Sequence, residues 1–371
     1  MSDETSASSP STSFPPTGHV KSGNAGPPPQ IIIQQSMFGW MGKALIALIV
    51  ILVMVIIGMV ANYRAYFNDP ERPQERFHSL ARHAAQKIAI IGVEGAIMEG
   101  DGFVKRQIDA VAEDPAVVAV VLRVNSPGGT VTGSDFIYHH LRELLEKRKL
   151  PMVVSMGSLC ASGGYYVAMA AGDGPDVLYA EPMTITGSIG VVMPHYDFSG
   201  LLGQWSVKDD SIATGPLKQM GSLTKPMTEE DRKALESILN DMFAGFKAVV
   251  MNGRPKFKED PAALDAVATG QVFTANQALE RGLIDKIGFL EEAILRAAKL
   301  ANVSADEVRC VKYEPPRTFA SELFGTEAGK LGLGRVADGY SLDAATLLDL
   351  TAPRAYYLWT MWPALLKSGG S

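Results

Sequence analysis

The stretch VVAVVLRVNSPGGT, residues 117–130, decides the fold class of this chain. Its first eight residues are apolar and mostly β-branched apart from Arg123, a pattern typical of a strand buried on both faces of a parallel sheet. Similar runs occur at 87–93 (KIAIIGV) and 152–155 (MVVS). Apolar residues with helical spacing lie between them, at 104–111 and 134–150, and Ser134 could cap the second helix. Strand–helix alternation predicts right-handed βαβ units, and therefore an α/β fold with helices outside a parallel sheet.

Two glycine-rich turns follow these strands, NSPGGT at 125–130 and CASGGYY at 160–166. Ligands of parallel α/β sheets bind at the carboxyl ends of the strands, where both turns are expected. Adjacent glycines let backbone N–H groups point at an anion, and Ser162 stands where a helix begins, so its negative form would be stabilised there. Neither turn contains the dinucleotide or phosphate-loop glycine pattern, and Cys160 replaces the first glycine of a nucleophile elbow. Ser162 is thus a candidate nucleophile.

The residues themselves offer two kinds of base for Ser162. His195 with Asp197 (PHYD) could complete a Ser-His-Asp set. Lys218 in TGPLKQMGS could serve if burial lowers the pKa of its amine enough to leave it neutral. His139 and His140 lie in the helix predicted at 134–150, where a surface or packing role is the default.

Three further helices are predicted: from Thr228, as N-cap, to Gly253, from Thr274 to Gly282, and over 290–300. After about residue 317 the alternation of apolar strands and amphipathic helices ends, and one apolar, aromatic stretch follows, AYYLWTMWPALL at 355–366. That stretch is too short to span a membrane, and it could contact a membrane surface, another copy of the chain or the core.

Residues 44–61 (ALIALIVILVMVIIGMVA) contain no charge and no proline. Eighteen residues of helix are about 27 Å long, and apolar flanks extend this toward the ~30 Å bilayer core. About 43 residues precede the run, which favours a retained single-span anchor over a cleaved signal peptide. The charges on its two sides do not decide its orientation. The Ser-, Thr-, Pro- and Gly-rich residues before it predict a disordered tail.

The composition excludes several function classes. The formal net charge of the 371 residues is −6, from 34 Lys and Arg against 40 Asp and Glu, so a dedicated nucleic-acid binder is not expected. Two cysteines, Cys160 and Cys310, are too few for a disulfide scaffold or a zinc site, and free thiols are expected.

Six blocks between residues 86 and 300 make the chain resemble the signal peptide peptidase A (SppA) family of serine endopeptidases, a branch of the Clp-protease/crotonase fold, an α/β superhelix of ββα units. The blocks are VNSPGG at 124–129, ASGGYY at 161–166, ITGSIGVV at 185–192, TGPLKQMGS at 214–222, MTEEDR at 227–232 and VFTANQALERGLIDKIGFLEEAI at 272–294. Their common order makes the resemblance specific.

The resemblance implies roles for five residues. Ser162 is the nucleophile, Lys218 the general base, and Ser188 the serine that orients the lysine. The backbone N–H groups of Gly129 and Gly163 form the oxyanion hole.

The chain departs from the family pattern around the lysine. Family members often have K-Y-K-D where this chain has P-L-K-Q, so Pro216 and Gln219 replace two charged residues. Lys208 and Lys225 are therefore competitors for the role of Lys218. Residues 172–175 (GDGP) lengthen the path from Ser162 to Ser188.

The implied protein is a membrane-anchored serine endopeptidase with a Ser/Lys dyad that degrades cleaved signal peptides and other hydrophobic membrane-derived peptides. It needs no metal or organic cofactor. It is a homo-oligomer whose active sites take serine and lysine from neighbouring subunits, and its catalytic domain lies outside the cytoplasm. Two alternatives are a crotonase-type acyl-CoA enzyme and a catalytically silent membrane scaffold. The predicted organisation is a tail at 1–40, a transmembrane anchor at 41–63, a linker at 64–85, a catalytic domain at 86–300 and an extension at 301–371.

Overall fold

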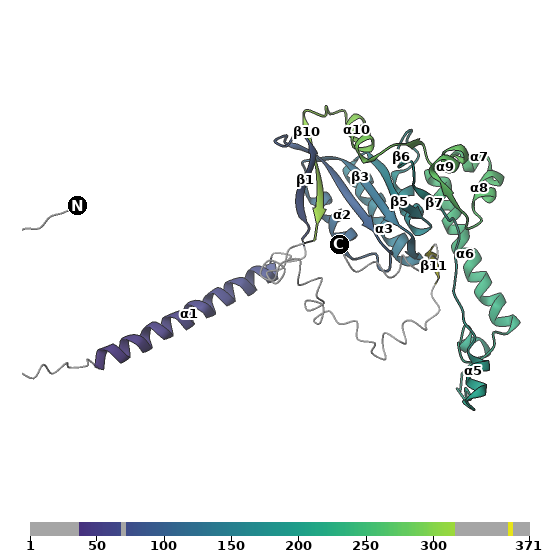
Figure 1. The fold of residues 1–371 in the computed structure, drawn as a ribbon, viewed down its shortest axis with the longest axis horizontal. Helices are drawn as coiled ribbons and strands as arrows, with labels where there is room; N and C mark the ends of the chain where they lie inside the picture. The colour runs from purple at the N-terminus through teal and green to yellow at the C-terminus, as the bar shows by residue number, and fades with distance from the viewer. Residues whose placement is uncertain (1–36, 68–71, 316–354, 359–371) are drawn as a thin grey trace, which may run out of the picture. The chain divides into compact units, whose positions relative to one another are not determined.

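The computed structural model describes residues 37–67, 72–315 and 355–358, and these form two separate units (Figure 1). The first unit contains the helix α1 (Met37–Phe67), in which Gly42–Val60 is long and apolar enough to cross a membrane. The predicted helical anchor is thus present as a helix. Most of the predicted tail and of the predicted extension lies outside the described residues.

The second unit is built on a nine-stranded, mostly parallel sheet, which confirms the predicted α/β class. Its main strand order is β1-β10-β2-β3-β5-β6-β9; β7 pairs in parallel with β5, and β8 pairs antiparallel with β7. Only β1 is antiparallel to its neighbour on the main path. The strands are β1 (Gln74–Leu80), β2 (Gln86–Glu94), β3 (Val117–Ser126), β5 (Met152–Ala161), β6 (Leu178–Ala180), β7 (Ile185–Gly187), β8 (Val272–Thr274), β9 (Lys286–Ile287) and β10 (Val308–Glu314).

Helices cover both faces of this sheet, so that it is buried as its apolar strands require. Along β2, Ala89, Ile91 and Val93 face the larger core, which α2, α3, α4 and α6 cover, while Ile88 and Ile90 face α10. The helices are α2 (Phe103–Glu113), α3 (Val131–Arg148), α4 (Gly163–Ala168), α5 (Ser199–Gln204), α6 (Glu229–Gly253), α7 (Lys256–Glu259), α8 (Pro261–Val267), α9 (Ala275–Arg281) and α10 (Leu290–Leu300), with short 3₁₀ turns η1 (Met169–Ala171) and η2 (Pro216–Gln219).

The sheet extends beyond the predicted domain boundaries of 86 and 300. Strand β1 lies in the predicted linker and β10 in the predicted extension, and β10 is inserted between β1 and β2. The β-branched residues of β10 are too few to stand out in the sequence. Cys310 on β10 and Cys160 on β5 are both buried and free, as expected.

The helix α3 begins three residues earlier than its predicted cap. The hydroxyl of Thr130 accepts from the N–H of Gly133 at 3.1 Å, which makes Thr130 the N-cap. Ser134 instead lies inside the helix and donates to the Thr130 carbonyl at 2.9 Å. The predicted N-caps Thr228 and Thr274 are confirmed, each with a capping box.

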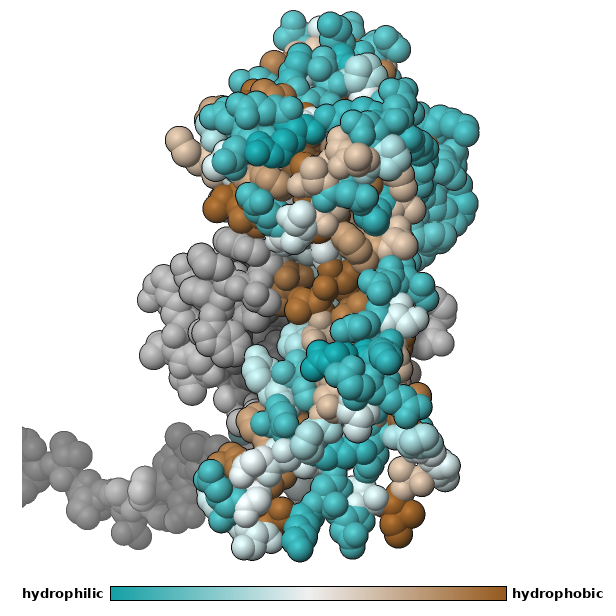
Figure 2. Space-filling view, turned by 90° about the vertical axis from the view of Figure 1, so that its right-hand side faces the viewer, coloured by the Kyte–Doolittle hydropathy of each residue, from teal (hydrophilic) through white to brown (hydrophobic). Residues whose placement is uncertain are grey.

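Residues 193–228 and the first turns of α6 form an arm that extends away from the sheet (Figure 1). Large apolar side chains are exposed on it: Tyr196, Phe198, Leu201, Trp205, Val207 and Ile212. Figure 2 shows apolar side chains both at the lower end of this face and in the recess between the arm and the body above it.

Candidate active site

Ser162 occupies a strained turn at the carboxyl end of β5. Its φ is 54° and its ψ is −115°, a conformation that costs free energy for a residue with a side chain. The turn is held from both sides, because the Ser162 N–H donates to the Gly187 carbonyl and its own carbonyl accepts from Tyr166 N, both at 2.8 Å. Ser162 thus caps α4 without using its side chain, which leaves the hydroxyl available.

The amides of Gly129 and Gly163 lie side by side next to this turn. A Cβ atom built on Gly163 would lie 3.1 Å from the Gly129 nitrogen, and one built on Gly128 would lie 3.1 Å from the Ser162 Cβ. Gly129 is in the short strand β4 (Gly128–Thr130), which Ile97 holds through hydrogen bonds of 2.9 and 2.8 Å. A Cβ on Gly129 would overlap the Ile97 carbonyl, so no other residue fits there. Two adjacent amides beside a serine are the donors that an oxyanion needs.

A cavity of about 470 Å³ joins Ser162 to Ser188. Ser188 also has a positive φ, 52°, and its N–H donates to the Gln271 carbonyl at 2.7 Å. Within the described residues, no hydrogen bond is made by the hydroxyl of either serine. Most of the remaining lining is apolar and comes mainly from the segment after β7 and from α6: Ile189, Val191, Val192, Leu239 and Phe243, with Glu236, Asn240 and Thr269 as polar exceptions.

Lys218 lies outside this cavity in a single chain. It is exposed in the turn η2 on the arm, and no lysine is among the described residues that line the cavity. Of its two competitors, Lys208 is exposed, and Lys225 donates to the Gln219 side chain at 2.7 Å. The structure therefore brings together Ser162, Ser188 and the two glycine amides, but not the predicted base.

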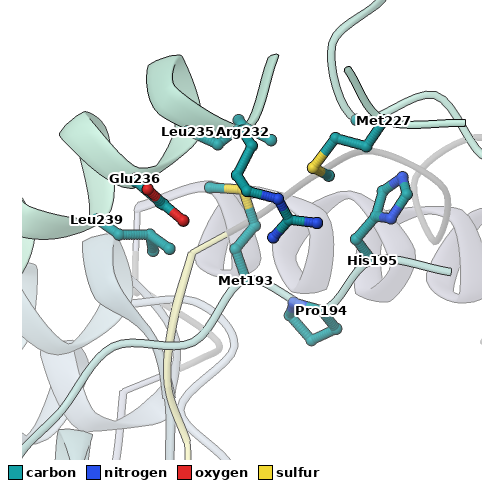
Figure 3. A pocket seen from close by; sticks show the side chains of 9 residues that line it. Met193, Pro194, His195, Met227, Arg232, Leu235, Glu236 and Leu239 are labelled. Atoms are coloured by element: carbon teal, nitrogen blue, oxygen red, sulfur yellow. The ribbon is translucent and has the colours of Figure 1, made fainter. Parts of the chain in front are cut away.

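His195 belongs to a second cavity of about 340 Å³, which lies between the 193–227 part of the arm and α6 (Figure 3). In Figure 3, Met193 and Arg232 lie between His195 and Glu236. The Nε2 atom of His195 is 3.1 Å from the Ser222 carbonyl, and Asp197 accepts from the Ser199 N–H at 2.8 Å. The two side chains thus have other partners, and the predicted alternative base does not reach Ser162 within one chain.

Cys160, two residues before Ser162, does not compete as a nucleophile. It is fully buried, and burial raises the pKa of its thiol well above the ordinary range, because the thiolate would lose its hydration. The nucleophilic position at this turn therefore falls to the serine.

One group of side chains in the described part of the chain has the spacing of metal ligands: His139, His140 and Glu143 on α3, whose ligand atoms lie within 4.8 Å of one another. The Nδ1 atom of His140 is 3.3 Å from the Oε2 atom of Glu143. The other carboxylate oxygen of Glu143 accepts a hydrogen bond from the Lys147 amine at 2.6 Å. None of the three lines the Ser162 cavity.

Sequence reasoning missed the strand that lies against the glycine amides. β11 (Tyr356–Leu358) pairs with β4, and Leu358 reaches the Ser162 cavity. The sequence shows the aromatic residues of this strand, but it does not predict where they lie in the fold, because about forty residues separate them from β10.

Comparison with known proteins decides the family. Residues 144–304 match peptidase family S49. A candidate protease of Synechocystis is 36% identical over 254 residues, which cover 67% of this chain and 88% of that protein. The chain belongs to peptidase family S49. It is an SppA-family serine protease, as its sequence blocks indicated.

Longer members of this family share only part of their length with the chain. Protease 4 of Salmonella typhi is 34% identical over 236 residues, 62% of this chain and 37% of that protein. The chloroplastic serine protease SPPA of Arabidopsis thaliana is 30% identical over 280 residues, 71% of this chain and 40% of that protein. The S49 match includes Ser162, Ser188 and Lys218, while Gly129 precedes it.

Proposed function

We propose that this SppA-family protease is a membrane-anchored endopeptidase with Ser162 as nucleophile and Lys218 of a neighbouring copy as general base. The observation that carries the proposal is the position of Ser162, in a strained turn beside two adjacent amides at the wall of a cavity.

The proposed reaction begins when a neutral Lys218 amine takes the proton of the Ser162 hydroxyl. The serine oxygen then bonds to the peptide carbonyl carbon, and the amides of Gly129 and Gly163 hold the resulting oxyanion. When the C–N bond breaks, the lysine ammonium returns its proton to the leaving amine. Water then hydrolyses the acyl-enzyme by the same route in reverse.

Sharing of the site between copies is supported by the position of the arm. Lys218 is on the arm, outside the Ser162 cavity of its own chain. The exposed apolar side chains of the same arm are suited to burial against a second copy. A lysine that enters a mostly apolar cavity loses hydration, which lowers the pKa of its amine. In this way, assembly of two copies would make Lys218 neutral and able to act as the general base.

Hydrophobic peptides, including cleaved signal peptides, are the proposed substrates. The apolar lining of the cavity supports this, and so does α1, which would hold the enzyme at a membrane where such peptides are released. A relative from Enterococcus faecium, 33% identical over 241 residues, is named for signal peptide peptidase activity. We place the catalytic domain outside the cytoplasm.

The test compares Ser162→Ala, Lys218→Ala and the control His195→Ala on a fluorogenic peptide with an apolar residue before the cut. We expect the first two to lose activity by about a thousandfold or more, and the control to keep it. A serine-directed covalent probe should label the wild type and His195→Ala but not Ser162→Ala. Full peptidase activity of Ser162→Ala would exclude Ser162 as the nucleophile. A wild type that is not labelled, does not cleave the peptide and turns over an acyl-CoA would favour a crotonase-type enzyme. An inactive, unlabelled wild type would favour the silent scaffold.

A further inference from the structure

The side of α3 that faces away from the core carries two histidines and a glutamate close together. Successive residues of an α-helix are turned by about 100°, so Glu143 lies one turn beyond His139 and His140 and between them around the helix axis. The possible ligand atoms of all three side chains lie within 4.8 Å of one another. The large apolar residues that α3 buries are on its other side: Ile137, Leu141, Leu144 and Leu145.

Contacts within the helix already hold two of these side chains near each other. The Nδ1 atom of His140 is 3.3 Å from the Oε2 atom of Glu143, and both residues are half-buried. The ring of His140 also packs edge-on against Phe136, with ring centroids 4.3 Å apart, and its centroid is 5.2 Å from that of His139. Side chains that are already close lose less rotamer freedom when an ion binds between them.

The competitor for the carboxylate is the amine of Lys147, which donates to the Oε1 atom of Glu143 at 2.6 Å. The Lys147 side chain is 72% exposed, and such exposed pairs within a helix are weak. A dication can therefore displace this amine from Glu143. The guanidinium of Arg142, also on α3, pairs instead with Glu146 at 3.0 Å.

We propose that His139, His140 and Glu143 bind one divalent transition-metal ion of the zinc and copper class. Imidazole nitrogen with a carboxylate oxygen is a donor set that these ions accept, whereas magnesium and calcium prefer oxygen donors alone. Three protein ligands leave a further position for water. The proposed peptide cleavage does not use this ion, because none of the three residues lines the Ser162 cavity.

An ion at this place joins two consecutive turns of α3. One turn before His139, Asp135 accepts a hydrogen bond from the Tyr166 hydroxyl of α4 at 2.7 Å. The Tyr166 N–H in turn donates to the Ser162 carbonyl at 2.8 Å. The metal thus stabilises the part of α3 that holds the nucleophile helix.

The test measures binding of zinc alone to the full chain in detergent, prepared without a polyhistidine tag, by competition with a fluorescent zinc indicator. We expect the wild type to hold one zinc ion per chain at about 10 µM free zinc, and His139→Ala and Glu143→Gln to bind at least about tenfold more weakly. His83→Ala, the matched control, removes an exposed histidine of another segment and should bind like the wild type. Lys147→Met removes the competing amine and should bind about twofold more tightly.

Two further measurements separate this site from loose binding elsewhere. With Cu²⁺ as a spectroscopic probe, electron paramagnetic resonance should show the nitrogen splitting of two imidazoles in the wild type and of one in His139→Ala. Zinc should raise the Tm of the wild type but not that of Glu143→Gln, because it binds only the folded helix. A wild type that holds no zinc under these conditions, or an affinity, copper spectrum and Tm that the His139 and Glu143 variants leave unchanged, would overturn the proposal.

Discussion

Two inactive variants should restore activity when they assemble together, if the site is shared as proposed. Ser162→Ala keeps Lys218, and Lys218→Ala keeps Ser162, so that neither protein alone contains a complete pair. In a mixed oligomer, a site is complete only where a Ser162 chain meets a neighbour that keeps Lys218.

The size of the effect follows from the position of Lys218, which is exposed on the arm and lies outside the cavity that contains Ser162 in the same chain. With equal amounts and random assembly, half of the chains supply a good serine and half of their neighbours supply a good lysine. About a quarter of the sites should then be active, whatever the number of copies in a closed ring. A lysine that acts within its own chain would give no active sites in the mixture.

The assay uses two affinity tags, one for each variant, and co-purified mixed oligomers are tested on the fluorogenic peptide. A mixture of Ser162→Ala with the double variant Ser162→Ala/Lys218→Ala is the control and should stay inactive. Mixed oligomers without activity would refute the shared site, and so would a wild type that is active as a monomer.

Three further predictions concern the groups that hold the site and the sheet. Gly129→Ala should cost most of the peptidase activity, measured with the fluorogenic peptide, because its Cβ would overlap a backbone carbonyl and shift an oxyanion donor; near wild-type activity would show that this amide is not needed. Asp285→Ala should lower the free energy of unfolding in urea by about 3–5 kcal/mol, since it leaves the half-buried Arg254 without its carboxylate partner at 2.6 Å and removes the acceptor of the Val177 and Leu178 N–H groups; a loss below 1 kcal/mol would contradict this. Burial would raise the pKa of Asp114 and is the largest single cause, but the hydrogen bonds from Lys87 and from the Ala116 N–H, with the positive charges of Lys87 and Arg148, together outweigh it and lower the pKa. The ionised carboxylate therefore stabilises the fold above its unfolded pKa of about 4, and Asp114→Asn should be less stable than wild type at pH 7 by a margin that disappears as the pH falls through the lowered pKa. A margin that is the same at pH 7 and pH 3 in urea unfolding would refute that assignment.

The sequence was most informative where local rules suffice. The buried strands are visible in the sequence as runs rich in β-branched residues. Thr228 and Thr274 are recognisable as N-caps from the chemistry of their side chains alone. It was less informative for β5, predicted over 152–155, which runs on to Ala161 through a glycine and a serine. Pairing with β3 and β7 keeps this polar part extended, and such long-range pairing overrides the propensity of single residues.

The candidate site likewise contains some residues that local sequence patterns predict and others that they do not. Ser162 and the two glycine amides could be predicted from local patterns, because a strand, a turn and a helix start bring them together. The positive φ of Ser188 and the seating of β11 depend on contacts between distant segments. For Lys218, the resemblance named the residue, while its place in the site depends on a second copy of the chain and stays a prediction.

The insertion of β10 between β1 and β2 has a consequence for the timing of biosynthesis. When the ribosome has completed α10, the nucleophile turn and the helices around it have all been made, yet β2 still lacks its outer neighbour. Only emergence of residues 308–314 closes that edge and brings β1 into register. A nascent chain thus cannot finish its sheet before nearly all of this unit has been translated.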